Sequence, residues 1–299
     1  MRGTKDRTDQ KGKGMRLRSL LFVPGDRPER MAKALAAGAD ALILDLEDAV
    51  APEKKPDARR FVAEFLAQPR TMPLFVRINA LRGQFIDDDF AAIVPVRPDG
   101  IVLPKSEGGA ALRDLDRCLT GLGDNEIRIL PIATETPQSV FGLGSYGGVT
   151  PRLCGLTWGA EDLLAAIGAA TARDDNELYT APYEVVRALA LFGAHAAQVP
   201  AVETVYPFLK DDAGLAAYAR RGRRDGFDGM MAIHPAQVPV INAAFTPTPG
   251  ELAWAKRVVA AFAADPDAGV LQIEGKMVDA PHLKQARALL AQGEPEKSE

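Results

Sequence analysis

Two stretches of the chain place carboxylates directly after a short apolar run. The run that begins Gly155-Leu-Thr-Trp ends in Glu161-Asp162, and the run that begins Arg128-Ile-Leu-Pro-Ile ends in Glu135. Apolar runs of this length are typical of strands buried on both faces, as in a parallel sheet. Magnesium is commonly held by one or two carboxylates, with water and substrate oxygens completing an octahedron. We therefore predict that Glu135 and Asp162 hold Mg²⁺.

Composition excludes several classes of protein. Of 299 residues, 47% are hydrophobic and 25% are charged, as in an ordinary soluble globular chain. The net charge of -4 offers no basic surface for nucleic acid, and no apolar run of about 20 residues predicts a membrane span. Cys118 and Cys154 have neither metal-site spacing nor the number needed for a disulfide framework, so we expect a cytoplasmic protein.

From Arg18 onward, a short apolar strand followed by an Ala- and Leu-rich helical segment recurs. This alternation predicts right-handed βαβ units in a parallel sheet, and eight of them most simply close into a (β/α)8 TIM barrel. An open doubly wound sheet is the alternative, but no Gly-x-Gly-x-x-Gly turn follows the first strand. The predicted strands are Ser19–Pro24, Ala41–Asp45, Leu74–Ile78, Gly100–Pro104, Ile129–Ala133, Gly155–Trp158, Val199–Glu203 and Gly229–Ile233.

Three regions are expected: a flexible tail at 1–14, the barrel at 15–250 and a C-terminal helical extension at 251–299, with Met15 as an alternative start. The last helix, Ala280–Ala291, has an apolar face that must be buried, and we expect this extension to cover the site of a neighbouring subunit. Helical spacing predicts three buried faces, which are Ala58, Phe61, Val62 and Phe65 in one helix; Val185, Val186, Leu189 and Phe192 in another; and Leu283, Ala286, Leu289 and Leu290 in the last.

The active site of such a barrel is built at the carboxyl ends of its strands. Each predicted strand runs into a polar or charged side chain, which helix capping alone explains poorly. His234 is interpreted as a hydrogen-bonded structural residue rather than a base. The groups that follow the strands in order are Asp26-Arg27, Asp45-Leu-Glu-Asp48, Arg77-Ile-Asn79, Lys105, Glu135, Glu161-Asp162, Glu203 and His234.

Seven motifs, in register along the chain, resemble a known family. They are Phe22-Val-Pro-Gly, Leu44-Asp-Leu-Glu-Asp-Ala, Val76-Arg-Ile-Asn, Leu103-Pro-Lys, Glu135-Thr-Pro, Gly159-Ala-Glu-Asp-Leu and Ile233-His-Pro. In this order they look like the signatures of the citrate lyase beta-subunit and malyl-CoA lyase family, within the HpcH/HpaI aldolase superfamily of magnesium-dependent barrels. The resemblance extends from about Arg18 to about Ala291.

The resemblance implies that Glu135 and Asp162 are the protein ligands of Mg²⁺, in agreement with their chemistry. It also implies that Arg77 reaches the substrate oxygens, where a guanidinium can bind an oxygen pair in bidentate fashion. A structural salt bridge to Asp45 or Glu47 is the alternative for this arginine. We interpret Asp45 and Glu47 as groups that orient Arg77 and accept hydrogen bonds from metal-bound water.

Further residues are assigned to substrate by the same resemblance. Basic residues on the first helix meet the phosphates of coenzyme A in family members, which implies this role for Arg27 and Lys33, although a solvated helix face is the alternative. Lys105 is expected to neutralise a substrate carboxylate. Phe22 is expected on the floor of the pocket.

The segment Gly275-Lys-Met-Val-Asp279 resembles the acyl-CoA-using branch, in which an aspartate here reaches the active site of an adjacent subunit. The alternative is that Asp279 only caps the helix that follows. The family resemblance further implies a homotrimer or hexamer.

The implied reaction is Mg²⁺-dependent carbon–carbon cleavage or formation of a 3-hydroxyacyl-CoA thioester of malyl-, citramalyl- or methylmalyl-CoA type. Its products would be acetyl- or propionyl-CoA and a small keto acid, glyoxylate or pyruvate. Two alternatives remain open. One is an acyl-CoA thioesterase on the same scaffold, and the other is the beta subunit of a citrate lyase complex that acts on a citryl thioester bound to an acyl carrier.

Overall fold

The computed structural model describes residues 16–293 and divides into two compact units, Met1–Asn242 and Ala243–Glu299. The division falls inside the helix α9 (Gln237–Ala244). The flexible tail predicted at 1–14 lies outside the described residues. No helix in the range 16–293 is long and apolar enough to cross a membrane.

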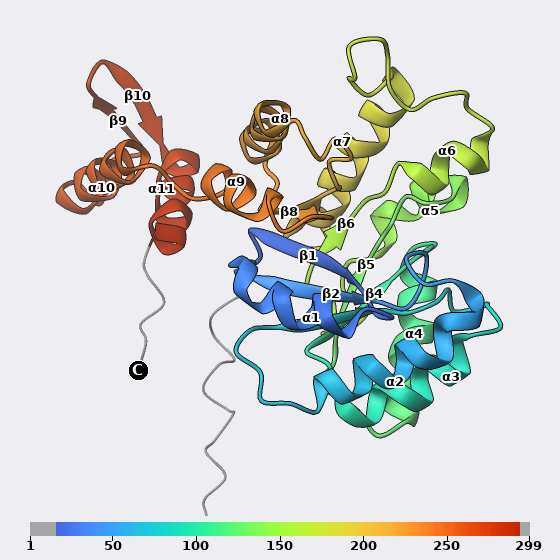
Figure 1. Ribbon diagram of the computed structural model, residues 1–299. Helices are drawn as coiled ribbons and strands as arrows, with labels where there is room; N and C mark the ends of the chain where they lie inside the picture. Colours follow the sequence, from blue (N-terminus) through green and yellow to red (C-terminus); the bar gives the residue numbers. More distant parts are fainter. Residues whose placement is uncertain (1–15, 294–299) are drawn as a thin grey trace, which may run out of the picture. The chain divides into compact units, whose positions relative to one another are not determined.

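The first unit contains eight parallel strands in the order β5-β4-β3-β2-β1-β8-β7-β6 (Figure 1). Two isolated parallel bridges, Ile129 to Leu153 and Ile132 to Thr157, join the region of β5 to that of β6 and nearly close the sheet into a barrel. The predicted TIM-barrel fold is therefore confirmed. The strands are β1 (Ser19–Pro24), β2 (Ala41–Asp45), β3 (Leu74–Arg77), β4 (Gly100–Leu103), β5 (Arg128–Pro131), β6 (Leu156–Thr157), β7 (Ala201–Glu203) and β8 (Gly229–Ala232).

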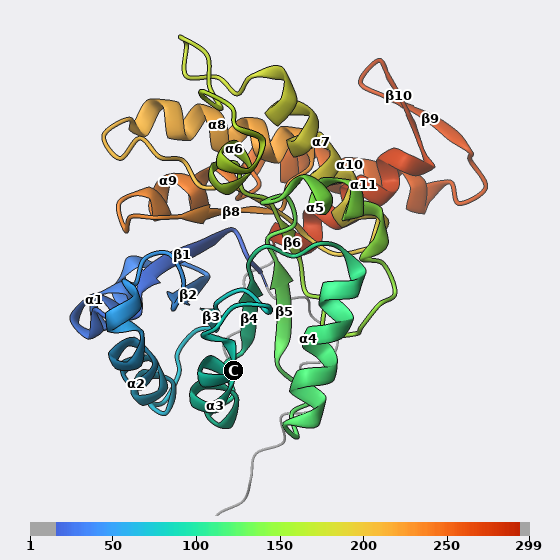
Figure 2. The ribbon, with the colours of Figure 1, turned by 90° about the vertical axis from the view of Figure 1, so that its right-hand side faces the viewer.

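Strand burial explains the continuous apolar runs in the sequence. Every residue of β2 is buried, because side chains on one face fill the barrel and those on the other face meet the surrounding helices. Figures 1 and 2 show α1 to α4 along the outside of strands β1 to β5. The helices of this unit are α1 (Pro28–Ala34), α2 (Lys55–Leu66), α3 (Ile86–Ile93), α4 (Gly109–Gly121), α5 (Pro137–Gly142), α6 (Glu161–Ile167), α7 (Ala181–Ala196), α8 (Asp212–Asp225) and the first part of α9.

The predicted buried face of α7 is wrong. Val185 is 57% exposed, Leu189 41% and Phe192 67%, so three of the four predicted residues lie on the outer side. The helix is apolar around much of its circumference, and periodicity alone could not tell which side faces the sheet. In α2 the prediction was nearer, since Ala58, Val62 and Phe65 are buried and Phe61 is partly exposed. The face of α7 that is buried carries Tyr183, Val186, Arg187, Ala190, Leu191 and Ala194.

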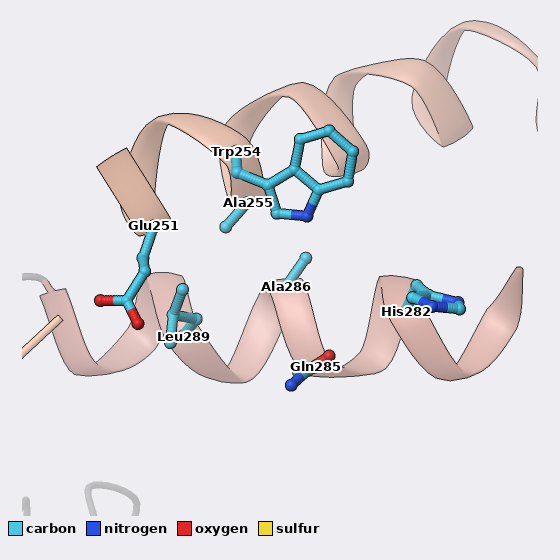
Figure 3. A pocket seen from close by; sticks show the side chains of 7 residues that line it. All are labelled: Glu251, Trp254, Ala255, His282, Gln285, Ala286 and Leu289. Carbon is cyan, nitrogen blue, oxygen red and sulfur yellow. The ribbon is translucent and has the colours of Figure 1, made fainter. Parts of the chain in front are cut away.

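The second unit has its own small core. It contains α10 (Pro249–Ala264), the antiparallel pair β9 (Val270–Ile273) and β10 (Lys276–Asp279), and α11 (Ala280–Gly293). Figure 3 shows α10 and α11 side by side, with Trp254 and Ala255 pointing toward Ala286. The apolar face of α11 therefore packs on α10 and the hairpin within the same unit. Ala286 is buried there, whereas Leu283, Leu289 and Leu290 are partly buried, and the expectation that the extension covers a neighbouring subunit's site stays a prediction.

A buried carboxylate ties four elements of the barrel together. Glu203, at the end of β7, is fully buried and accepts hydrogen bonds from Trp158 Nε1 at 2.6 Å and Tyr218 Oη at 2.9 Å. Its second oxygen accepts a hydrogen bond from Arg187 Nε at 2.7 Å, and Arg187 also reaches Asp225 at 2.8 Å. These partners satisfy Glu203 and make it structural. Its appearance at a strand end therefore does not mark it as part of the site.

Replacing Glu203 with alanine is predicted to reduce the free energy of unfolding by about 3 kcal/mol, because buried Arg187 loses its most buried partner. The matched control is Asp225→Ala, which removes the partly exposed partner of the same arginine and should cost about 1 kcal/mol or less. Urea denaturation followed by circular dichroism measures both values. Equal small losses in the two variants would show that Glu203 does not hold these elements together.

Candidate active site

Arg77 and Asp45 form the ion pair at the centre of the site. They are register partners on the neighbouring strands β3 and β2, so both side chains leave the barrel at the same carboxyl edge. Arg77 Nε lies 2.7 Å from Asp45 Oδ1 and Nη2 lies 2.5 Å from Oδ2. The Phe22 ring, on β1, lies 4.9 Å from the guanidinium carbon. Arg77 is therefore held in one orientation by a two-point contact and an aromatic face.

Asp45 is itself fixed by the backbone that follows it. Its two carboxylate oxygens accept hydrogen bonds from the N–H groups of Glu47, at 2.9 Å, and Ala49, at 3.1 Å. The Gly25 N–H donates to the Asp45 carbonyl at 2.9 Å, and a Cβ on Gly25 would stand only 2.6 Å from that oxygen. Glycine is required here because the first strand's loop passes too close to β2 for any side chain.

Glu47 is buried and has one oxygen that accepts no hydrogen bond from the described residues. Its Oε1 accepts from Lys105 Nζ at 2.6 Å. Its Oε2 lies 3.1 Å from Arg77 Nη1, an ion pair without hydrogen-bond geometry. Burial raises the pKa of Glu47, and the nearby Arg77 and Lys105 oppose that rise. Lys55, which the sequence analysis did not single out, donates to the Leu46 and Glu47 carbonyls and fixes this turn.

Lys105 links the two predicted metal ligands. Its N–H donates to Glu135 Oε2 at 2.5 Å, and its Nζ lies 3.6 Å from Asp162 Oδ1. The residue has φ of +50°, a left-handed conformation that costs a non-glycine residue roughly 1–2 kcal/mol. This turn allows one residue to direct its backbone donor at β5 and its ammonium at the start of α6.

Glu135 is buried among negative charges. Burial first, and then the neighbouring Glu47 and Asp162 carboxylates, raise its pKa to about 8, against a lowering by the Lys105 N–H. A Cβ on Gly159 would stand 3.3 Å from Glu135 Cγ, a tight contact that places the Glu135 side chain directly against this glycine. An ionised Glu135 would be stabilised by an added cation.

The oxygen donors of this cluster fit a hard divalent cation. Glu135 and Asp162 supply carboxylates, and the unsatisfied Glu47 Oε2 can accept a hydrogen bond from a bound water. Within residues 16–293, no group of three or more His, Cys, Asp or Glu side chains is arranged to hold a metal ion. A magnesium ion here would therefore draw its remaining ligands from water and substrate, which is its usual behaviour.

Other residues assigned from sequence have partners of their own or are exposed. Arg27, which precedes α1, is exposed and forms an ion pair with Asp26 at 3.6 Å, and Lys33 lies exposed on α1. Asp279 belongs to the second unit, where its Oδ1 lies 2.5 Å from His282 Nδ1. His234 is exposed and its Nδ1 accepts from the Ala236 N–H at 3.2 Å, in keeping with a structural residue.

A hollow of about 250 Å³ lies in the second unit between α10 and α11 (Figure 3). Its polar lining residues are Glu251, His282 and Gln285, and the others are apolar. It lacks the converging carboxylates and paired cations found at the strand ends. We therefore place the candidate site at the strand ends.

The family described as HpcH/HpaI aldolase/citrate lyase matches residues 18–235, which include every member of this cluster. The chain belongs to the HpcH/HpaI aldolase/citrate lyase family. The family resemblance read from the seven motifs is confirmed, and the matched span contains all eight strands.

Individual members of the HpcH/HpaI family are similar over nearly the whole chain. A citrate lyase subunit beta-like protein of Mycobacterium tuberculosis H37Rv is 37% identical over 273 residues, covering 90% of this chain and 93% of that protein. A (3S)-malyl-CoA thioesterase of Cereibacter sphaeroides ATCC 17029 is 34% identical over 283 residues, covering 93% of this chain and 94% of that protein. Citrate lyase subunit beta of Escherichia coli K12 is 32% identical over 287 residues, covering 93% of each.

Solved structures of HpcH/HpaI family members share the fold. The protein CitE from M. tuberculosis, in complex with magnesium, acetoacetate and coenzyme A, has a TM-score of 0.79 and 34% identity, covering 94% of this chain and 98% of that one. The citrate lyase beta subunit of M. tuberculosis, complexed with oxaloacetate and magnesium, has a TM-score of 0.68 and 33% identity over 80% of this chain and 100% of that one.

Glu135→Gln is predicted to stabilise the metal-free protein at pH 8. Because the folded-state pKa of Glu135 is raised from 4.5 to about 8, the folded protein binds more protons and stability falls as pH rises through that window. Removing this group should recover on the order of 3 kcal/mol at pH 8 and little at pH 4.5. Urea denaturation in a chelator at both pH values measures this, with the exposed Glu53→Gln as control. Equal effects of both variants at pH 8 would contradict the prediction.

Proposed function

We propose that this protein is a Mg²⁺-dependent carbon–carbon lyase that cleaves or forms a 3-hydroxyacyl-CoA thioester. The observation that carries the proposal is the cluster of Glu135, Asp162 and Glu47 around Lys105, beside the oriented Arg77–Asp45 pair. Relatives named for citrate lyase and malyl-CoA thioester chemistry support it, as does the related CitE structure that contains magnesium, acetoacetate and coenzyme A.

In this proposal, Glu135 and Asp162 hold Mg²⁺. The ion would supply Lewis-acid chemistry at the substrate hydroxyl or keto oxygen, stabilising the charge that develops there. Glu47 Oε2 accepts no hydrogen bond from the described residues and has an ion-pair contact with Arg77 Nη1, so it can accept a hydrogen bond from a water in the ion's shell.

Arg77 would stabilise developing negative charge on the same oxygens. Its Nε and Nη2 donate to Asp45, so the nitrogen proposed to meet substrate is Nη1, which has ion-pair contacts with Glu47 at 3.1 Å and Asp48 at 3.6 Å. The bidentate edge expected to bind substrate is thus used for orientation. Asp45 keeps the guanidinium aimed, and the Phe22 ring limits its movement.

Asp279 is proposed as the group that exchanges a proton with the acyl-CoA carbon. Its hydrogen bond with His282 lowers the pKa of Asp279, so the pair holds it as a carboxylate. That form suits removal of a proton from acetyl- or propionyl-CoA in the condensation direction. In the cleavage direction the same carboxyl would have to deliver the proton, which this hydrogen bond opposes. Arg27 and Lys33, both exposed, are proposed to meet the phosphates of coenzyme A.

A thioesterase is the second candidate, because one relative at 34% identity is named (3S)-malyl-CoA thioesterase. In that reaction water attacks the thioester carbonyl and coenzyme A leaves, without cleavage of a carbon–carbon bond. The subunit of a citrate lyase complex, acting on a carrier-bound citryl thioester, is the third, supported by the E. coli relative. The products separate the first two, and dependence on an acyl carrier separates the third.

The test uses the purified protein with Mg²⁺ and a panel of malyl-, citramalyl- and methylmalyl-CoA. A lyase is expected to give acyl-CoA and a keto acid in equal amounts, whereas a thioesterase gives free CoA and a hydroxy acid.

Glu135→Gln and Asp162→Asn should each lower kcat/KM by about a hundredfold or more, because they remove a ligand of the proposed Lewis acid. The control is the exposed Glu53→Gln, which should leave kcat/KM unchanged. Activity near the parent's in either ligand variant would remove the metal assignment.

Asp279→Ala is predicted to lose most lyase activity while retaining the fold and Mg²⁺ binding. His282→Asn tests the pair, since it should change the pH profile of activity without removing the acid. If a homotrimer or hexamer shares its sites between subunits, mixing Asp279→Ala with Glu135→Gln subunits restores part of the activity. Parent-like activity of Asp279→Ala would leave this residue as a helix cap, and no recovery after verified subunit exchange would argue against shared sites.

A further inference from the structure

We propose that Lys105 is the internal counter-ion of the metal site, a positioning residue whose ammonium bridges Glu47 and Asp162 in the metal-free protein and releases Asp162 when a divalent cation binds. This inference rests on the proposed assignment of Glu135 and Asp162 as ligands. It gives Lys105 a purpose different from neutralising a substrate carboxylate.

The two contacts of the ammonium differ in strength. Nζ lies 2.6 Å from Glu47 Oε1, a charge-assisted hydrogen bond to a buried partner, and 3.6 Å from Asp162 Oδ1, an ion pair without that hydrogen bond. Asp162 has 35% of its side chain exposed, against 8% for Glu47. The contact with Asp162 is therefore the one that a competing cation can replace, while Glu47 retains the lysine.

The backbone of Lys105 serves the same site. Residues with positive φ other than glycine among those described are Arg97, Lys105, Glu177, Gln198 and Glu274, and Lys105 is the one within the carboxylate cluster. Its left-handed turn aims the N–H at Glu135 Oε2, 2.5 Å away, while the side chain reaches Asp162. Lys105 thus positions both proposed ligands. Its backbone N–H holds Glu135, and its ammonium, which can move, contacts Asp162.

The charges explain why such a counter-ion is needed. Glu47, Glu135 and Asp162 bring three carboxylates to one edge of the barrel, while Arg77 is engaged mainly by Asp45. Without a divalent cation, the Lys105 ammonium is the positive charge in contact with two of the three. An arriving dication would replace that compensation and repel the ammonium, since like charges a few ångströms apart repel. Metal binding and the Lys105–Asp162 contact are then competing events.

The experiment compares Lys105→Met with the parent by titrating Mn²⁺ into the metal-free protein and measuring its dissociation constant calorimetrically. Loss of the competing charge is expected to tighten Mn²⁺ binding by about tenfold. The metal-free variant should melt at a lower temperature than the parent, and saturating Mn²⁺ should remove most of that difference. The matched control is Lys54→Met, an exposed lysine of the same unit, which should leave the dissociation constant unchanged.

Two further variants separate the ammonium from the backbone. Lys105→Gln removes the same charge but keeps a polar side chain, and it should also tighten Mn²⁺ binding. It replaces Lys105→Met in the titration if the methionine variant does not fold. Lys105→Arg keeps the charge and should bind with an affinity close to the parent's. Unchanged or weaker binding by both neutral variants, with the parent binding normally, would overturn the inference alone. Absence of saturable Mn²⁺ binding by the parent would overturn the metal assignment and the inference with it.

Discussion

Crowding of negative charge at one edge of the barrel is the constraint on which the site depends. Three carboxylates, two from the segments after β2 and β5 and one from the start of α6, meet where burial and then their mutual repulsion raise the pKa of Glu135. A fourth, Asp45, is reserved for Arg77 by a two-point contact and two backbone donors. Each cation therefore has a separate task. Arg77 is held by Asp45, whereas Lys105 has a close contact with Glu47 and a longer one with Asp162.

The barrel supplies the geometry that makes such crowding possible. Because all eight strands are parallel, their carboxyl ends share one edge, and side chains far apart in sequence meet there without long loops. The hydrogen bond from the Lys105 N–H to Glu135 spans 30 residues, and the ion pair of its ammonium with Asp162 reaches the start of α6. The number of hydrogen-bond donors around a carboxylate distinguishes a candidate site residue from a structural one at this edge. Glu203 is the last residue of β7, whereas Glu135 lies beyond the end of β5, and four neighbours donate hydrogen bonds to Glu203.

Much of the barrel was predictable because its signals are local. The bounds predicted for β1 and β2 agree with the structure, and those of the remaining strands agree to within a few residues. The alternation of apolar runs and polar ends also located the carboxylates that meet. What failed depends on tertiary contacts. The side of α7 that faces the sheet could not be read from a helix that is apolar on several sides, and the packing of α11 on α10 was not predicted because a hairpin separates the two helices. The left-handed backbone conformation of Lys105 could not be predicted either, because a lysine, unlike a glycine, does not indicate a positive φ.

The second unit has a core of its own between α10, the hairpin and α11, and this determines how Asp279 is held. The span matched by the family, residues 18–235, ends before it begins. The Asp279–His282 pair stands where β10 meets α11, so its geometry is fixed by contacts inside the second unit.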